Sequence, residues 1–311
     1  MTTLMVDREG RGDAMPAGTS SLPQMQRIVP AKSWGARVLA ATLVLLLAAF
    51  VLAVVTGGGV QWREIPQYLF DPTILSGVEL TLVFTILSMA LSIVGGVAVA
   101  MMRMSANVVL NGLARLFVWF FRGTPLLVQI IFWFNIQLFI PRLAIGPWSV
   151  DMNQIISAFT AALLALTLNE TAYMAEIIRG GLLSVDRGQA EAAAALGYTP
   201  WQSLRRIILP QALRVTIPPI GNQTISMLKT TSLVSVVAAQ DLLTRAQNIY
   251  ARNFLIIELL IVASVWYLVM TTVASSLQLT VERRLSRSLG EPPRRRWVRR
   301  AAPTLEDGNH G

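Results

Sequence analysis

Ionisable side chains inside apolar stretches are the residues of this sequence best placed to do chemistry. Glu170 and Glu176 fall in one apolar stretch, Lys229 in a second, and Arg122 near the end of a third. A charge at membrane depth is costly unless it faces a cavity or a partner, so each is a candidate for binding a charged ligand. Mutual pairing as structural locks is the alternative. For Glu176, Arg179 three residues later favours a salt bridge at a helix end. Arg122 and Lys229 can equally extend to the membrane interface.

Catalytic and metal chemistry have few residues available. The chain has no cysteine, which excludes disulfides, thiolate metal sites and cysteine nucleophiles. Its single histidine, His310, lies one residue from the C-terminus, so we expect no catalytic or metal centre built on histidine. Neither Lys32 nor Lys229 follows a glycine, as the phosphate-binding loop of ATPases requires. We therefore expect a chain that is not an enzyme and holds no cofactor of its own.

The composition predicts an integral membrane protein. The 311 residues are 54% hydrophobic and 14% charged, and the mean hydropathy is +0.56. An α-helix needs about 20 mostly apolar residues to cross the hydrocarbon core. Six stretches meet this requirement: Val38 to Val55, Leu75 to Met102, Leu116 to Ile140, Ile155 to Ile178, Thr216 to Ala238 and Phe254 to Val281. The predicted fold is all-α, with about six transmembrane helices.

The distribution of positive charge predicts the orientation of these helices. Most of the 26 Lys and Arg residues fall in segments on the same side of the membrane as the N-terminus. The positive-inside rule therefore places both termini in the cytoplasm. We interpret the tail "PPRRRWVRR", residues 292–300, as a topology signal that contacts anionic lipid headgroups, and we expect no nucleic-acid partner.

One long cytoplasmic stretch, "GQAEAAAALGYTPWQSLRRIILPQ" at 188–211, has the pattern of two short amphipathic helices. Residues 189–196 are rich in alanine, and Gly197 falls where a left-handed residue ends a helix. Thr199 and Gln202 form the pattern of a capping box at the start of a second helix, which Pro210 is expected to disrupt. Such a pair either lies on the membrane surface or docks into a groove on a soluble partner.

Several of these residues carry a family resemblance. Glu191, Ala192 and Ala193, then Gly197, Ile207, Leu209 and Pro210 are spaced as E-A-A-x-x-x-G, nine residues, then I-x-L-P. With "FRGTPLLVQ" at 121–129, "NETAYMAEIIRGGLLSV" at 169–185 and "LKTTSLVSVV" at 228–237, this motif resembles the EAA loop of ABC-importer permeases of the polar amino-acid uptake family. The similarity covers roughly Gly77 to Arg284.

The resemblance implies a fold, partners and a location in the inner membrane. The fold would be the five-helix core of a type I ABC importer, preceded here by one additional N-terminal helix. The EAA loop would form coupling helices in clefts of a separate pair of ATPase subunits, which bind ATP and Mg. A second permease subunit, identical or paralogous, and an extracytoplasmic amino-acid-binding protein complete the implied assembly. Glu191 is then expected at the partner surface or in a hydrogen bond that stabilises the loop, and Gly197 at the hinge.

The same resemblance gives the ionisable residues a ligand. A zwitterionic amino acid needs a group of each sign, so Glu170, flanked by Asn169 and Thr171, is expected to meet the ammonium. Lys229 or Arg122 is expected to meet the carboxylate.

The predicted organisation has four parts. They are a disordered cytoplasmic leader at 1–36, the additional helix and an external loop at 37–74, the permease domain at 75–284 with its loop at about 184–215, and a basic tail at 285–311. A secondary transporter or a channel is the alternative function, and a related solute such as an opine is the alternative substrate.

Overall fold

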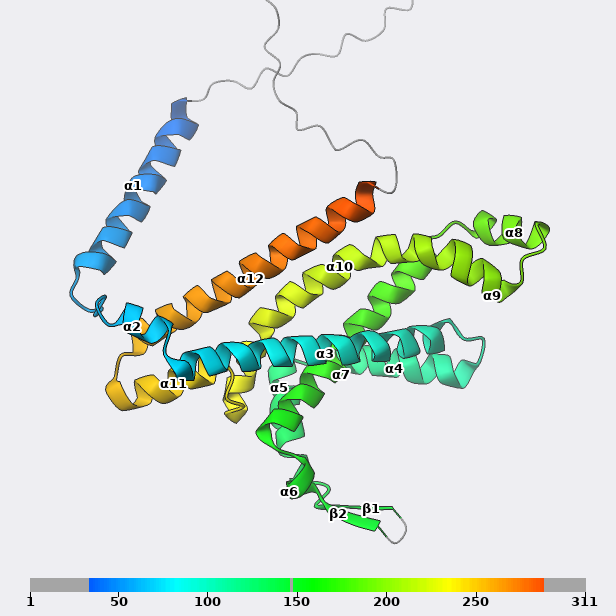
Figure 1. The fold of residues 1–311 in the computed structure, drawn as a ribbon, viewed down its shortest axis with the longest axis horizontal. Helices are drawn as coiled ribbons and strands as arrows, with labels where there is room; N and C mark the ends of the chain where they lie inside the picture. Colours follow the sequence, from blue (N-terminus) through cyan, green and yellow to red (C-terminus); the bar gives the residue numbers. More distant parts are fainter. Residues whose placement is uncertain (1–33, 146–147, 288–311) are drawn as a thin grey trace, which may run out of the picture. The chain divides into compact units, whose positions relative to one another are not determined.

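The computed structural model describes residues 34–145 and 148–287 (Figure 1). The chain forms two compact units, residues 1–58 and residues 59–311. The first unit contains α1 (Trp34–Thr56), an apolar helix whose described side chains are exposed. Residues 1–33 of the predicted leader and 288–311 of the predicted tail lie outside the described residues.

The second unit is mostly helical, and its elements follow one another with short connections. In chain order they are α2 (Ile65–Leu69), α3 (Pro72–Met104), α4 (Val108–Gly123), α5 (Leu126–Phe134), the 3-10 turn η1 (Ile136–Leu138), β1 (Arg142–Ile145), β2 (Trp148–Asp151), α6 (Met152–Ile155), α7 (Ala158–Leu183), α8 (Arg187–Ala195), α9 (Pro200–Ser203), the π-helical turn η2 (Leu204–Ile208), α10 (Leu209–Thr230), the 3-10 helix η3 (Thr231–Val237), α11 (Leu242–Asn253) and α12 (Ile256–Arg287). In Figure 1, α8 and α9 lie at one end of this unit, and α2 and α11 lie at the other.

Three helices of the described part are long and apolar enough to cross a membrane, namely α3, α7 and α12. A fourth span results if the bent pair α4 and α5 is counted as one. The helix α10 is not among them, because prolines, amides and charges interrupt its apolar residues. Six spans therefore remain a prediction, whereas the mostly helical, apolar character is confirmed.

The main core lies where α3 crosses α7. Phe84 and Leu166 are fully buried there. A Cβ atom on Gly96 would lie 2.5 Å from the Cβ of Met174, so glycine at this position allows the two helices to approach closely. The crossing fixes the part of α7 that carries the polar candidates.

A second core joins α11 and α12 to the beginning of α3. A Cβ atom on Gly77 would lie 2.8 Å from the Cα of Leu242, so α11 packs directly on the backbone of α3. The backbone N–H of Leu242 donates to the Thr81 hydroxyl at 3.1 Å. Together these contacts hold α11 against α3.

The predicted span Leu116 to Ile140 is not one continuous helix. Two helices, α4 and α5, meet there at an angle of 103°. Pro125 is the cause, because it disfavours helical geometry at the preceding residue, and Thr124 is accordingly extended with φ −108° and ψ 143°.

The connection from α5 to α7 contains a small hairpin that the all-α prediction did not include. Its strands β1 and β2 are antiparallel, with Arg142 opposite Asp151. The hairpin is a local addition to an otherwise helical unit.

Candidate functional site: the α8–α9 loop and the polar face of α7

The first helix of the predicted loop, α8, ends before Gly197 as the sequence predicted, and it begins two residues earlier than predicted, at Arg187. The Asp186 carboxylate caps its N-terminus and accepts from the N–H of Gly188 at 2.7 Å. At its C-terminus Gly197 has φ +81°, and the N–H groups of Gly197 and Tyr198 donate to the carbonyls of Ala194 and Ala193 at 2.9 and 3.0 Å. This is the Schellman arrangement, in which a left-handed glycine reverses the chain direction after a helix.

The second helix begins with the predicted capping box. The Thr199 N–H donates to the Gln202 side-chain oxygen at 2.9 Å, and the Gln202 N–H donates to the Thr199 hydroxyl at 3.3 Å. Pro200 occupies the first turn, where its missing N–H costs no hydrogen bond. The reversal and the capping box together set the direction in which α9 leaves α8.

The expectation that Pro210 disrupts the second helix is wrong. The chain continues from α9 through the π-helical turn η2 into α10, and Pro210 lies in the first turn of α10. The wider turn of a π-helix relieves the clash between a proline ring and the carbonyl four residues earlier. The loop is therefore joined to α10 by continuous helix.

Two large apolar side chains of this loop face solvent. Leu196 is 78% exposed and Trp201 is 66% exposed. Glu191 is also exposed and has no hydrogen-bond partner among the described residues, so the proposed loop-stabilising bond is not formed there. Of the other motif residues, Ala193 is buried, Ile207 is half-buried, and Ala192, Leu209 and Pro210 are exposed.

Glu170 lies on the buried side of α7. Its side chain is 4% exposed, and one carboxylate oxygen, Oε2, accepts a hydrogen bond from Gln223 Nε2 on α10 at 3.1 Å. The other oxygen, Oε1, is buried without a hydrogen-bond partner in the described part of the chain. A buried acceptor of this kind has capacity for one more donor.

The two neighbours of Glu170 have structural contacts. Thr171 donates its hydroxyl to the Thr167 carbonyl at 2.7 Å, along α7 itself. Asn169 donates to the Phe121 carbonyl at 2.8 Å, and Gln129 Nε2 donates to the same carbonyl at 3.1 Å. Asn169 and Gln129 thus satisfy a backbone carbonyl of the segment "FRGTPLLVQ" at the α4–α5 bend.

The structure does not bring the predicted cations to Glu170. Lys229 is exposed, and Arg122 is exposed with its guanidinium 5.0 Å from the centre of the Tyr173 ring. Among the described residues Glu170 has no ion pair. The predicted pair of Glu176 with Arg179 is formed at 2.9 Å, and Arg103 of α3 also pairs with Glu176.

Two amides beside these candidates, Gln223 and Gln129, were not predicted as site residues. Both are uncharged, so the cost of a charge at membrane depth does not single them out in the sequence. The polar run Asn222, Gln223 and Thr224 inside an apolar stretch was the available signal.

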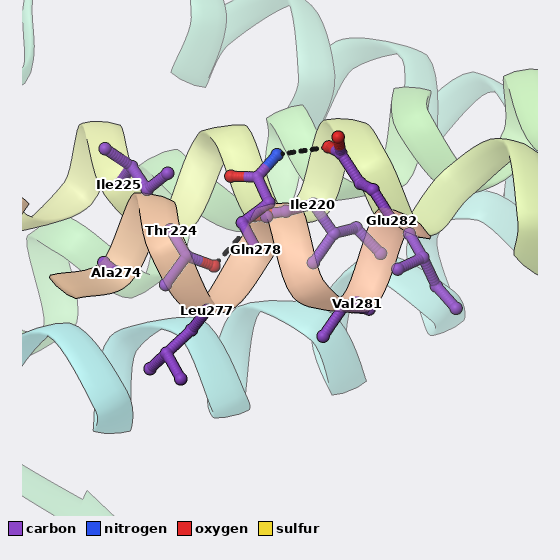
Figure 2. Close-up of a pocket in the computed structure, with 10 residues that line it drawn as sticks. Ile220, Thr224, Ile225, Ala274, Leu277, Gln278, Val281 and Glu282 are labelled. Carbon is purple, nitrogen blue, oxygen red and sulfur yellow. Dashed lines mark hydrogen bonds between the residues drawn. The ribbon is translucent and has the colours of Figure 1, made fainter. Parts of the chain in front are cut away.

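A groove of about 310 Å³ lies between α10 and α12 (Figure 2). Gln278 of α12 donates to Asn222 of α10 at 2.9 Å and to Glu282 at 2.7 Å, the second of which Figure 2 shows. Consecutive residues of α10 therefore contact different helices, with Gln223 on α7 and Asn222 on α12.

Known proteins resemble this chain over most of its length. Residues 92–287 match the family described as binding-protein-dependent transport system inner membrane component. An arginine transport system permease protein of Corynebacterium glutamicum is 41% identical over 260 residues, which cover 83% of this chain and 82% of that protein. A glutamine transport system permease protein of Escherichia coli is 36% identical over 215 residues, which cover 69% of this chain and 93% of that protein.

Solved structures agree with the sequence relatives. An amino acid ABC transporter crystallised with histidines has a TM-score of 0.64 and 36% identity, covering 72% of this chain and 99% of that chain. The MetNI methionine ABC transporter, at 20% identity and a TM-score of 0.57, shares the fold. The chain therefore belongs to the family of binding-protein-dependent transport system inner membrane components.

Proposed function

We propose that this chain is the translocation subunit of an ATP-driven importer of amino acids. The observation that carries the proposal is the α8–α9 loop, which presents Leu196 and Trp201 to solvent at one end of the helical unit. Exposed apolar side chains on a rigidly capped helix pair are typical of a surface that a protein partner covers. The relatives are permease subunits, which supports a partner ATPase that binds ATP and Mg.

The coupling path runs through continuous helix. Because α9, η2 and α10 follow one another without a break, a displacement of α9 is transmitted to α10. Gln223 of α10 contacts Glu170 of α7 at 3.1 Å, so the same displacement changes the surroundings of Glu170. ATP-driven approach of two partner subunits would thereby switch the permease between inward- and outward-facing states.

Glu170 is the proposed contact for the substrate ammonium. Its free, buried Oε1 accepts one more hydrogen bond, and an ammonium supplies donor and compensating charge together. Arg122 and Lys229 remain the proposed groups for the carboxylate, reached in the assembled permease pair. That pair is formed with a second permease subunit, identical or paralogous.

The proposed orientation follows the positive-inside rule, with both termini and the α8–α9 loop in the cytoplasm. The opposite end, which holds α2 and α11, then faces outwards and receives an extracytoplasmic amino-acid-binding protein (Figure 1).

Reconstitution with an ABC ATPase subunit from the same organism tests the proposal. We expect copurification of the two proteins and uptake of an amino acid that requires both ATP and the binding protein. The double substitution Leu196→Ala with Trp201→Ala should abolish copurification, whereas Phe139→Ala, at a 70% exposed position away from the loop, should not. Uptake by the chain alone, without an ATPase, would favour a secondary transporter or a channel. The solute panel includes opines, because a nopaline transport system permease protein of Agrobacterium fabrum is 37% identical over 213 residues.

A further inference from the structure

A polar pocket of about 460 Å³ lies beside α11. The helix α11 lies at the end of the helical unit opposite the α8–α9 loop (Figure 1). It is lined by one hydroxyl, three side-chain amides, one apolar residue and two guanidinium groups: Thr73, Gln240, Asn248, Asn253, Ile249, Arg245 and Arg252. No acidic side chain is among these residues. The mechanism proposed above makes no use of this pocket.

The two arginines share one face of α11. Arg252 lies seven positions after Arg245, which is about two helical turns or roughly 10 Å along the axis. Neither forms an ion pair with a described residue. The Nε atom of Arg245 is buried and has no hydrogen-bond partner in the described residues. The pocket thus holds two cationic groups that are not neutralised within the described chain.

Local packing keeps this face in place. The Arg245 stem lies over Gly77, where a Cβ atom would be 3.0 Å from the Cγ of Arg245. Asn253 donates to the Tyr68 hydroxyl at 3.0 Å, and Asn248 donates to the Gln240 side chain at 3.3 Å. The amides are therefore engaged with neighbours, while the guanidinium groups retain free donors.

We propose that this pocket is a docking site for acidic side chains of the extracytoplasmic binding protein. The inference rests on the proposed function, because the orientation given there places α11 on the outer side. A guanidinium presents a planar fork of donors that matches a carboxylate. The single α-carboxylate of a free amino acid would pair with one guanidinium and leave the other uncompensated, whereas a protein surface supplies two acidic side chains. Arg252 and Asn248 are exposed, so the pocket is open to a protein.

Titration of the reconstituted complex with solute-loaded binding protein tests the site. The measured quantity is the concentration of binding protein that gives half of the maximal ATPase stimulation. We expect Arg252→Gln to raise it roughly tenfold, as the loss of one charge-assisted pair should. The double variant, Arg245→Gln with Arg252→Gln, should raise this half-saturating concentration further and make it less dependent on salt.

Arg142→Gln is the matched control, because it removes the same charge from an exposed position on β1. The half-saturating concentration of binding protein should stay within about twofold of the wild-type value, because an exposed ion pair contributes little to affinity. A charge-reversing Arg252→Glu should recover affinity for a binding protein in which one surface Asp or Glu is replaced by Arg.

Equal half-saturating concentrations in the wild type and both arginine variants would overturn the inference. Stimulation of the wild type by free amino acid alone, lost in the arginine variants, would assign the pocket to solute and also overturn it. A wild-type complex without any stimulated ATPase activity would contradict the proposed function itself, which is a distinguishable result.

Discussion

Gln223 of α10 donates a 3.1 Å hydrogen bond to Glu170 of α7, and this contact joins the helix that continues from the α8–α9 loop to the buried carboxylate. The second oxygen of Glu170 is left without a partner in the described residues. A carboxylate with one oxygen hydrogen-bonded and the other without a partner is suited to bind a cationic group reversibly. The contact thereby links the proposed coupling loop to the proposed substrate site.

Glu170→Gln should reduce transport without reducing the yield of the assembled complex. The substitution keeps the shape of the side chain and a hydrogen bond to Gln223 but removes the charge that an ammonium requires. Uptake in vesicles should fall at least about tenfold, the effect of roughly 1.4 kcal/mol.

Lys229→Met and the double variant provide the control for a structural lock. Because Lys229 is exposed and Glu170 has no ion pair among the described residues, neither single variant should lower the yield of detergent-extracted complex. Yields that collapse in both single variants and recover in the double variant would contradict the ligand role. Unchanged uptake by Glu170→Gln would contradict both roles.

Gly197→Val should leave the protein inserted in the membrane but reduce ATP-driven uptake. The φ of +81° places a side chain in the left-handed region, at a cost of about 1–2 kcal/mol, and the open surroundings offer no contact in return. The strain should change the direction in which α9 leaves α8.

Gly197→Asn is the matched control, since asparagine tolerates the left-handed region better than a β-branched residue. Its uptake should lie between those of the wild type and Gly197→Val. Normal uptake by Gly197→Val would contradict the claim that the chain reversal after α8 requires a glycine.

Asp241, the N-cap of α11, should give the protein a pH-dependent stability. Burial raises the pKa of its carboxyl above the ordinary value of 3.8, and hydrogen bonds from Thr244, Leu243 and Tyr267 oppose that rise only in part. The folded state therefore holds this proton to a higher pH than the unfolded state does. The contribution to the free energy of unfolding is largest below pH 3.8 and is lost as the pH rises through the folded-state pKa.

Thermal unfolding in detergent from pH 4 to pH 7 measures this effect. Asp241→Asn keeps a side-chain oxygen as helix cap but does not titrate. The unfolding temperature of the variant should therefore increase relative to that of the wild type as the pH rises. Parallel pH profiles of the two proteins would exclude Asp241 as the source.

Asn169→Leu should destabilise the α4–α5 bend. It removes the 2.8 Å hydrogen bond to the Phe121 carbonyl and leaves a buried polar network incompletely satisfied, at a cost of about 1–3 kcal/mol. Asn135→Leu, which removes a 2.8 Å hydrogen bond at an exposed position, is the control. Equal unfolding temperatures for the two variants would contradict the structural role of Asn169.

The loop was predictable because its signals are local. Gly197, Thr199 and Gln202 act through backbone groups within a few residues, so their spacing alone predicts the reversal and the capping box. The ion pair of Glu176 with Arg179 is local in the same sense, since one helical turn separates the two residues.

The differences between prediction and structure have both local and distant causes. The apolar run from Leu116 to Ile140 gives no hint of its 103° bend beyond Pro125, and the amides that satisfy that bend come from α5 and α7. Pro210 was expected to disrupt a helix, but the π-helical turn before it accommodates the proline ring and the helix continues. The contact of Glu170 with Gln223 joins residues 53 positions apart, which no spacing rule predicts.

Accessibility of a cysteine placed at Trp201 tests the coupling loop most directly. The chain has no cysteine of its own, so Trp201→Cys gives a single thiol in the wild-type background, and Phe139→Cys gives a matched thiol away from the loop. We predict that the partner ATPase protects the Trp201→Cys thiol from a maleimide added to the detergent-solubilised complex and leaves Phe139→Cys labelling unchanged. Equal maleimide labelling of Trp201→Cys with and without a bound, active ATPase would contradict the claim that this loop is where the ATPase docks.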